Sequence, residues 1–500
     1  MVSGGVKTGL VLTASALALA LPQGAAQADT LQEALTGAYL NNPTLEAARA
    51  QLRATDESVP IERSAGLPSL DTTVTATEVL KQNTTSFFAP GRLLTVGADL
   101  GVPVYSGGAV KNSIKAAEER VQAGRADLRA TESAIFSRVV AAYMDVLRGQ
   151  ALVALSANQV DVLSVNVDAT SDRFEIGDLT RTDVAQSQAR LAVAQGDLRT
   201  AQANLIAARE DYIALVGEAP SDLAPPPPLP GFPDDVDTAV SIALESNPDL
   251  IAAQERAAAA GYDINVAGSG RLPRVSVFAG YDYQNFLGSI PDRFEDPTDP
   301  NSPRIPSDQT AAGASAGVSL RMPIFQGGRT AALQRQAQAR ASAALETIIA
   351  TERDVIAQVR SAWSSWQASL AIIESSQSAV AAADLSLEGV RAENSIGNRT
   401  ILDVLNAEQE LLQSRVQLVT ARRNAYVAGF SLLAAMGRAE ARDLGLAGEG
   451  VLYDPVANYD RVKGKIWDWG RDPDPETRTS RTVEVPAATA EIPETADTGN

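Results

Sequence analysis

Residues 102–108 read Val-Pro-Val-Tyr-Ser-Gly-Gly, and residues 322–328 read Met-Pro-Ile-Phe-Gln-Gly-Gly, 220 positions further along the chain. Nearer the N-terminus, Asn42-Pro43 recurs as Asn247-Pro248, 205 positions later. A large unit is therefore duplicated in tandem, and the second copy carries one insertion of 15 residues. Because the unit is far longer than a solenoid repeat, each copy is predicted to be an elaborate structure, with pseudo-symmetry between the two.

The first 28 residues are predicted to be a secretory signal peptide. Lys7 supplies its positive charge, residues 9–21 form an apolar run, and Ala26-Gln27-Ala28 is the cleavage site. The run is shorter than the roughly 20 residues of a membrane-spanning helix, and we expect no such helix elsewhere in the chain. With no cysteine, neither a disulfide nor a lipid-modified cysteine is available. The expected locations are the periplasm, the exterior and the outer membrane.

Composition excludes several functions. The full chain has a net charge of −19, so nucleic acid is not an expected partner, because phosphate binding needs basic surface. The absence of histidine excludes histidine-based catalysis and histidine metal sites. The sequence also lacks a phosphate-binding loop and a nucleophile elbow. We therefore expect no catalytic residue, no cofactor and no metal, and we do not expect an enzyme.

Long proline-free segments carry an apolar residue at every seventh position. In the longest segment of each copy, the first being residues 109–176, these are Val139, Val146, Val153, Val160, Val167 and Phe174, then Val359, Trp366, Ile373, Val380 and Leu387. In the helices that follow, they are Val184, Leu191, Leu198, Leu205 and Tyr212, then Val404, Leu411, Leu418, Ala425 and Leu432. This repeat predicts coiled-coil helices, the longest on the order of 100 Å long.

A further helix is predicted at the start of each copy, over residues 31–64 and 236–267. Together with the second helix of the coiled-coil pair, it is about as long as the longest helix. We expect these two shorter helices to stack end to end beside the long one. Trp363 and Trp366 on the long helix are interpreted as packing residues, whereas Trp467 and Trp469 near the C-terminus have no assigned role.

Each copy also contains two short segments that alternate between apolar and small or polar residues. The positions on the first face are Leu70, Thr72, Val74 and Ala76; Leu94, Val96, Ala98, Leu100 and Val102; Val275, Val277, Ala279, Tyr281 and Tyr283; Ala314, Ala316, Val318, Leu320 and Met322. Such runs of about ten residues are typical of outer-membrane β-barrels, although strands of a soluble sandwich alternate too. Four strands cannot close into a barrel, and a membrane-spanning barrel must close. Several chains are therefore expected to share one barrel.

These features divide the chain into a signal peptide (1–28), a first repeat (29–217), a proline-rich linker (218–233), a second repeat (234–438) and an acidic tail (439–500). Each repeat is predicted to hold a helix, two barrel strands, a long helix and a final helix. The second repeat has the longer extracellular loop, residues 285–311. A calcium site in that acidic loop is an alternative to a solvated loop, but its spacing fits no EF-hand. The tail is predicted to be disordered at least from Arg471.

The combination resembles the TolC-like family of outer-membrane channel-tunnels over about residues 31–437. Its most specific motifs are the Asn-Pro-x-Leu opening of each copy, the Pro-x-aromatic-x-Gly-Gly strand exits, and residues 397–405. The resemblance implies a mainly α fold with a small β part, assembled as a homotrimer. Tandem-duplicated coiled-coil hairpins would form a periplasmic α-barrel, and four strands per chain would contribute to a 12-stranded outer-membrane β-barrel.

The function that this resemblance implies is the outer-membrane exit duct of a tripartite export system in a Gram-negative bacterium. The duct would conduct proteins, as in type I secretion, or small toxic compounds. Its implied partners are two further copies of the chain, a periplasmic adaptor (membrane fusion) protein, an inner-membrane ABC- or RND-type pump, and outer-membrane lipid. Two other functions stay open, a periplasmic adaptor and a structural coiled-coil envelope protein. An adaptor is expected to have one hairpin, a small β-rich domain and a membrane anchor, and a structural coiled-coil protein would not need the alternating strands.

The resemblance also implies a closed periplasmic end, held by a latch between the two hairpins. Arg399 is implied to bond to Thr182 and Asp183 of the other hairpin. Asn394 stands where the family has a tyrosine that takes part in the latch. One latch bond of the family is therefore not expected here.

The implied pore is lined by Asp403. A second acidic position of the family is occupied by Asn406, so the pore is expected to bind cations less strongly than one with two acidic rings. The residues themselves indicate another role for the aspartates, because Thr180 with Asp183 and Thr400 with Asp403 have the spacing of helix N-caps. The two roles are compatible.

Glycines are expected at both ends of the long helices. Gly177 and Gly397 suit the left-handed position that ends a helix, and so mark the hairpin turns. Hinges between strand and helix are predicted at Pro103, Gly107, Gly108, Pro323, Gly327 and Gly328.

Overall fold

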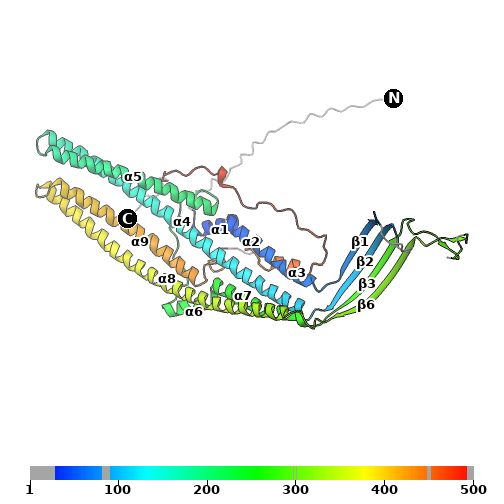
Figure 1. The fold of residues 1–500 in the computed structure, drawn as a ribbon. Coiled ribbons are helices and arrows are strands. Elements are labelled where there is room, and N and C mark those ends of the chain that lie inside the picture. Colours follow the sequence, from blue (N-terminus) through cyan, green and yellow to red (C-terminus); the bar gives the residue numbers. More distant parts are fainter. Residues whose placement is uncertain (1–28, 82–89, 297, 300, 447–451, 493–500) are drawn as a thin grey trace, which may run out of the picture.

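Both halves of the chain follow the same plan, with short helices, two long strands, a long helix and a final helix, in the computed structural model, which describes residues 29–81, 90–296, 298–299, 301–446 and 452–492. The first half contains α1 (Leu31–Asn41), α2 (Pro43–Asp56), α3 (Ser58–Ser64), β1 (Ser69–Glu78), β2 (Arg92–Tyr105), α4 (Ala109–Glu175) and α5 (Arg181–Val216). The second contains α6 (Val236–Ser246), α7 (Pro248–Gly268), β3 (Arg274–Asn285), β6 (Thr310–Arg321), α8 (Arg329–Ser395) and α9 (Ile401–Ala435). The predicted signal peptide lies outside the described residues. Figure 1 shows the sheet at one end of the molecule and the turns of the two long hairpins at the other.

The N-terminal helix of each copy is broken, contrary to the prediction of one continuous helix. Pro43 lacks the N–H that a helix interior needs, so α1 ends at Asn41. The Asn42 side chain then caps α2, because its Oδ1 accepts the N–H groups of Thr44 (3.0 Å) and Leu45. Its Nδ2 donates to the carbonyl of Leu215 at the end of α5, over 2.9 Å.

The second copy repeats this arrangement. Asn247 caps α7 through the N–H groups of Asp249 and Leu250, and its Nδ2 donates to the carbonyl of Ala435, the last residue of α9, over 3.0 Å. Both asparagines are buried, each 4% exposed. The Asn-Pro motif therefore joins the start of each copy to its last helix.

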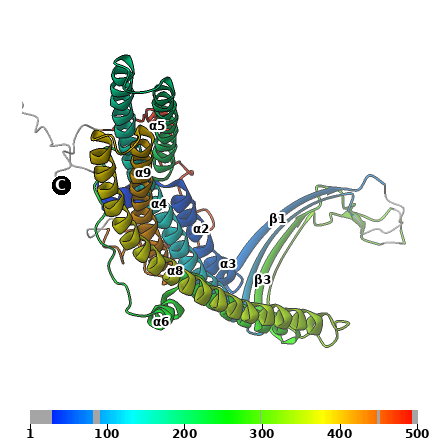
Figure 2. The same cartoon turned by 90° about the vertical axis from the view of Figure 1, so that its left-hand side faces the viewer.

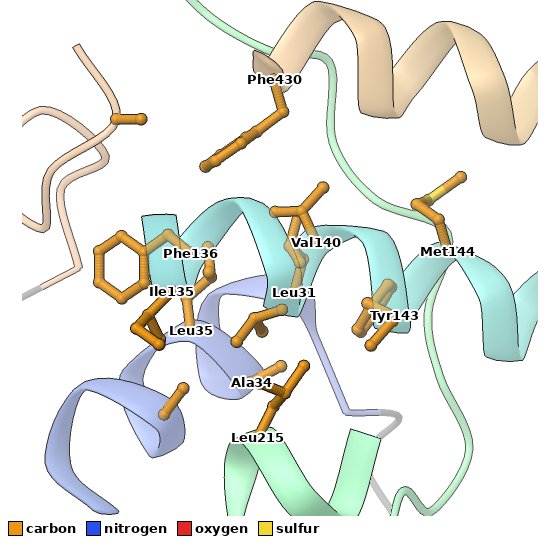
Figure 3. Close-up of a cluster of buried hydrophobic side chains, with 14 of the residues drawn as sticks. Leu31, Ala34, Leu35, Ile135, Phe136, Val140, Tyr143, Met144, Leu215 and Phe430 are labelled. Carbon is orange, nitrogen blue, oxygen red and sulfur yellow. The ribbon is translucent and has the colours of Figure 1, made fainter. Parts of the chain in front are cut away.

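The largest core cluster lies where α1, α4 and the end of α5 meet, with Phe430 of α9 packed above them (Figure 3). Phe136 and Tyr143 of α4 are fully buried there. The predicted heptad positions near this cluster, Val139 and Val146 among them, are also fully buried. Towards the hairpin turn the same series becomes more exposed, and Phe174 is 43% exposed. From this core the helices extend as two hairpins, the first formed by α4 and α5 and the second by α8 and α9.

One stretch of α4 has the length and composition of a membrane-spanning helix, which the sequence was not expected to contain. The fully buried residues Phe136, Val139 and Tyr143 belong to α4. They lie in the core cluster, which α4 shares with α1, α5 and α9. The apolar character of α4 therefore reflects its place in the helical core.

The four long strands form one antiparallel sheet with the order β1-β2-β3-β6. The register places Leu70 opposite Leu100, Ala98 opposite Tyr281, and Val277 opposite Val318. Because side chains alternate between the two faces of a strand, the predicted apolar positions of all four strands share one face. Figure 2 shows that the strands arch away from the helices, as the wall of a wide barrel would. The loop between β3 and β6 contains two short strands, β4 (Arg293–Phe294) and β5 (Arg304–Ile305).

The linker between the copies lies on the second hairpin. Tyr426 of α9 donates a hydrogen bond to the carbonyl of Pro227, over 3.0 Å. Phe232 stacks on Trp366 with ring centroids 4.3 Å apart, and Trp363 meets the edge of Trp366 at 5.5 Å. The interpretation of Trp363 and Trp366 as packing residues is therefore confirmed.

The C-terminal tail lies on the first repeat, and this includes residues 471–492, for which the sequence predicts disorder. This segment is extended, with one short 3₁₀ turn at Thr482–Glu484. Arg209 of α5 donates to the carbonyls of Thr489 and Glu491, the latter over 2.8 Å. Backbone carbonyls of the tail therefore accept hydrogen bonds from two nitrogens of a buried arginine.

Candidate functional site: the turns of the two hairpins

The hairpin turns have the same geometry in both copies. Gly177 has φ +82° and Gly397 has φ +80°, a left-handed conformation that favours glycine. The N–H of Asp178 donates to the carbonyl of Arg173 over 2.9 Å, and Asn398 makes the equivalent bond. This bonding pattern ends the long helices in a Schellman motif. The predicted role of both glycines is thus confirmed.

The helices that leave the turns begin with capping boxes. The backbone N–H and hydroxyl of Thr180 donate to Oδ2 of Asp183 over 2.9 and 2.7 Å, and Thr400 makes the same two bonds to Asp403. Hydrogen bonds from the threonines lower the pKa of Asp183 and of Asp403, and Arg399 lowers the latter further. The capping interpretation is confirmed, and both carboxylates carry negative charge at neutral pH.

Arg399 is engaged within its own turn. Its Nε donates to Oε2 of Glu393 over 2.7 Å, and Nδ2 of Asn394 donates to the Arg399 carbonyl over 2.8 Å. Among the described residues of this one chain, no hydrogen bond joins Arg399 to Thr182 or Asp183. Asn394 therefore organises the turn around Arg399.

Asn406 contacts the other hairpin. Arg190 of α5 donates to Oδ1 of Asn406 over 2.9 Å. Next to Asn406, Leu405 of α9 is buried in an apolar cluster with Leu163 of α4 and Ala194 of α5. The first turns of α9 therefore form the contact surface between the hairpins.

Glu408 forms a second polar link between the hairpins. It is 3% exposed and accepts hydrogen bonds from Asn166 of α4 and Arg391 of α8, each over 3.0 Å. Burying a carboxylate raises the free energy of the folded chain unless such partners form hydrogen bonds to it. The sequence does not predict these contacts, because heptad spacing indicates the packing within a hairpin and not the packing between hairpins. The residues concerned are Glu408, Asn166, Arg391 and Arg190.

The predicted hinges lie where strands meet long helices. The register between β2 and β3 shifts between Pro103 and Tyr105, which ends regular pairing there. Gly107 has φ +67°, and a Cβ on it would lie 2.8 Å from Leu272. In the second copy Pro323 follows β6, and Gly327 and Gly328 have φ +57° and +83°. Gly108 and Gly328 are the residues that precede α4 and α8.

The second face of the sheet is polar. The register places Asp71 opposite Asp99, Asp99 opposite Gly280, and Asp282 opposite Gly97. Small residues beside the aspartates leave room for their carboxylates. A closed barrel built from this sheet would present one face to lipid and a polar, acidic face to its interior.

Comparison with known proteins identifies relatives over nearly the whole chain. The family profile described as "Outer membrane efflux protein" matches residues 34–218 and 239–438. Outer membrane efflux protein BepC of Brucella suis biovar 1 is 34% identical over 450 residues, covering 90% of this chain and 94% of its own. Outer membrane protein TolC of Vibrio cholerae is 27% identical over 433 residues, covering 85% and 95%. The crystal structure of the outer membrane protein VceC from Vibrio cholerae matches with a TM-score of 0.68 at 24% identity, covering 81% and 96%.

Proposed function

Because this chain belongs to the outer membrane efflux protein family, we propose that three copies of it form one continuous duct. The chain has the TolC-like channel fold and is an outer-membrane protein of a Gram-negative bacterium that extends into the periplasm. It is the exit duct of an export system. The proposals that follow concern its assembly, its gate and its partners.

The two open edges of the sheet support this assembly. β1 and β6 are the outer strands, and within the described ranges no further strand pairs with either of them. Lipid offers no hydrogen-bond partner to an unpaired strand, so β1 of one chain must pair with β6 of the next. Three chains would then close a barrel of 12 strands, in which repeats 29–217 and 234–438 alternate around the axis.

The lipid-facing surface of this barrel is the apolar face described above. Its interior surface carries Asp71, Asp99 and Asp282 from each chain. Three copies of this acidic face favour cations over anions, because like charges in a narrow passage attract counter-ions. The hairpins continue the passage into the periplasm as an α-barrel.

The hairpin turns form the gate at the periplasmic end. Asp403 supplies one ring of three charges, and Asn406 contributes no second ring. For the latch, Arg399 is half-exposed and its partner Glu393 belongs to the same turn. In the latch, Arg399 would bond instead to Thr182 and Asp183 of a neighbouring chain. Thr182 is exposed. The hydrogen bond from Arg190 to Asn406 and the Glu408 contacts hold the two hairpins of one chain together.

The same end would receive the partners of the duct. An exit duct without an energy source needs an inner-membrane pump, of the ABC or RND type, and a periplasmic adaptor to join the two. The name of one relative, BepC, describes it as an efflux protein. Small toxic compounds are therefore the first cargo class to test, and secreted proteins are the second.

Single-channel conductance tests the duct. The protein without its signal peptide would be purified in detergent and inserted into a planar bilayer under a salt gradient. A small conductance with preference for cations is expected, because the gate is mostly closed and the passage is acidic. Folded, trimeric protein that never conducts would contradict the proposed pore.

A further inference from the structure

Three large apolar side chains of the tail face solvent and have no role in the duct. Ile466, Trp467 and Trp469 are 70%, 75% and 85% exposed. The N–H of Gly470 donates to the carbonyl of Trp467 over 3.2 Å, so a tight turn presents both tryptophans together. Exposed tryptophans close in sequence are unusual on a surface that contacts only water.

The position of this turn is fixed by contacts to the first repeat. Helix α10 (Ala457–Val462) packs on α2. Asn458 donates to Oδ2 of Asp56 over 2.7 Å, and Arg63 of α3 donates to the carbonyl of Lys463 over 3.0 Å. The tail is therefore anchored immediately before the tryptophans.

This anchoring point is next to the sheet. Arg63 precedes Ser69, the first residue of β1, by six positions, which span at most about 22 Å of chain. Figure 1 shows the segment beside α3, at the end of the helical body from which the sheet emerges. The turn that carries Ile466, Trp467 and Trp469 therefore follows an anchoring point close to the end of the helical body from which the sheet emerges.

We propose that Ile466, Trp467 and Trp469, here called the aromatic anchor, insert into the periplasmic leaflet of the outer membrane beside the barrel. The inference rests on the proposed barrel, whose strands emerge from this end of the helical body. Tryptophan prefers the boundary between headgroups and acyl chains, because its ring is apolar and its N–H needs a polar partner. The aromatic anchor would extend the contact with lipid from the strands to the helical body.

The charges around the aromatic anchor indicate the kind of contact. Lys463 pairs with Asp460, Lys465 with Asp472, and Arg471 with Asp474. Because each of these cations has an acidic partner, attraction to anionic lipid is not the source of binding. The occupant that fits is the headgroup and acyl boundary of phospholipid, and the insertion should be insensitive to salt.

Tryptophan fluorescence in vesicles tests this proposal. The chain has four tryptophans, and Trp363 and Trp366 pack inside the helical wall. Wild-type trimer and the W467F/W469F control would be placed in phosphatidylcholine vesicles with or without bromine on the acyl chains. Brominated lipid should quench the wild type severalfold more than the control, at low and at high salt. The W363F/W366F variant, which keeps only the anchor tryptophans, should show the strongest quenching.

Two results would overturn the aromatic anchor. Quenching of Trp467 and Trp469 by aqueous iodide, with no effect of brominated lipid, would place them in water. Protection from both quenchers would show that a protein surface covers them. Ion conductance measured on the same vesicles separates the two proposals, because conducting vesicles without lipid quenching leave the duct intact and reject the aromatic anchor alone.

Discussion

Arg190 of the first hairpin donates a hydrogen bond to Oδ1 of Asn406 of the second hairpin, over 2.9 Å. Family resemblance gives position 406 an acidic side chain in the pore. In this chain the position is neutral and joins the two hairpins. Asn406 therefore contributes to the contact between the hairpins near their turns.

The first prediction concerns this hydrogen bond. N406A removes the acceptor and should raise the fraction of time that the channel conducts, whereas N406D should lower it by forming an ion pair with Arg190. Single-channel recordings would measure the effect, with Q188A on the exposed face of α5 as the control. Equal opening in N406A and wild type would contradict a role in closure.

Glu408 provides a second test. E408A leaves Asn166 and Arg391 without their shared acceptor, so the unfolding free energy should fall by about 2–3 kcal/mol, since hydrogen bonds to charged groups are the stronger ones. E408Q retains an acceptor oxygen and should lose less. Urea unfolding followed by circular dichroism would measure both. E410A, at an exposed position of the same helix, should behave like wild type, and an equally stable E408A would contradict the proposed link.

Arg399 and Glu393 should have opposite effects on the gate. R399A removes the latch to the neighbouring chain and should raise conductance several-fold. E393A frees Arg399 from its 2.7 Å partner and should favour contact with Thr182 and Asp183, so conductance should fall. Loss of closure in both variants would show instead that the Arg399–Glu393 pair itself shapes the turn. R422A, on α9 away from the turn, is a suitable control.

The pH dependence of ion selectivity should report Asp403. Its threonine bonds hold its pKa below the usual 3.8, so its charge persists from neutral pH downwards and is lost only as the pH falls through that lowered value. The reversal potential should keep its cation preference to about pH 4 and decline below it. In D403N, the part of the cation preference that depends on the Asp403 charge should be absent at every pH. A midpoint above about pH 5 would mean that repulsion within the ring of three carboxylates sets the pKa.

The Asn-Pro motif should be a stability element. N42A removes both the cap of α2 and the donor to Leu215, and should cost about 2 kcal/mol, roughly half from each. N42S retains a capping oxygen and should cost about half as much. Urea unfolding midpoints would distinguish the two. If N42S and N42A were equally stable, the cap would contribute nothing.

The sequence predicts the parts of the fold that depend on residues close to one another in the chain. Heptad residues such as Val139 and Val404 mark helices, and alternation marks strands, because both periods follow from backbone geometry. The break at Asn42 has a local signal in Pro43, but the hydrogen bond from Asn42 to Leu215 could not be predicted, because Leu215 is 173 positions away. Gly177 and Asp183 were predictable from turn and cap chemistry. Glu408 was not, since a single polar residue in a heptad gives no sign that another hairpin covers it.

The two outer strands of the sheet have a genetic consequence. In the proposed trimer every chain needs a neighbour on both sides, so a chain damaged in β6 would still pair through an intact β1 and enter the ring. When normal and damaged chains are made in equal amounts, roughly one trimer in eight would contain only normal chains. Each of the others would have a gap in its wall. Mutations in β6 should therefore be dominant over a normal copy of the gene.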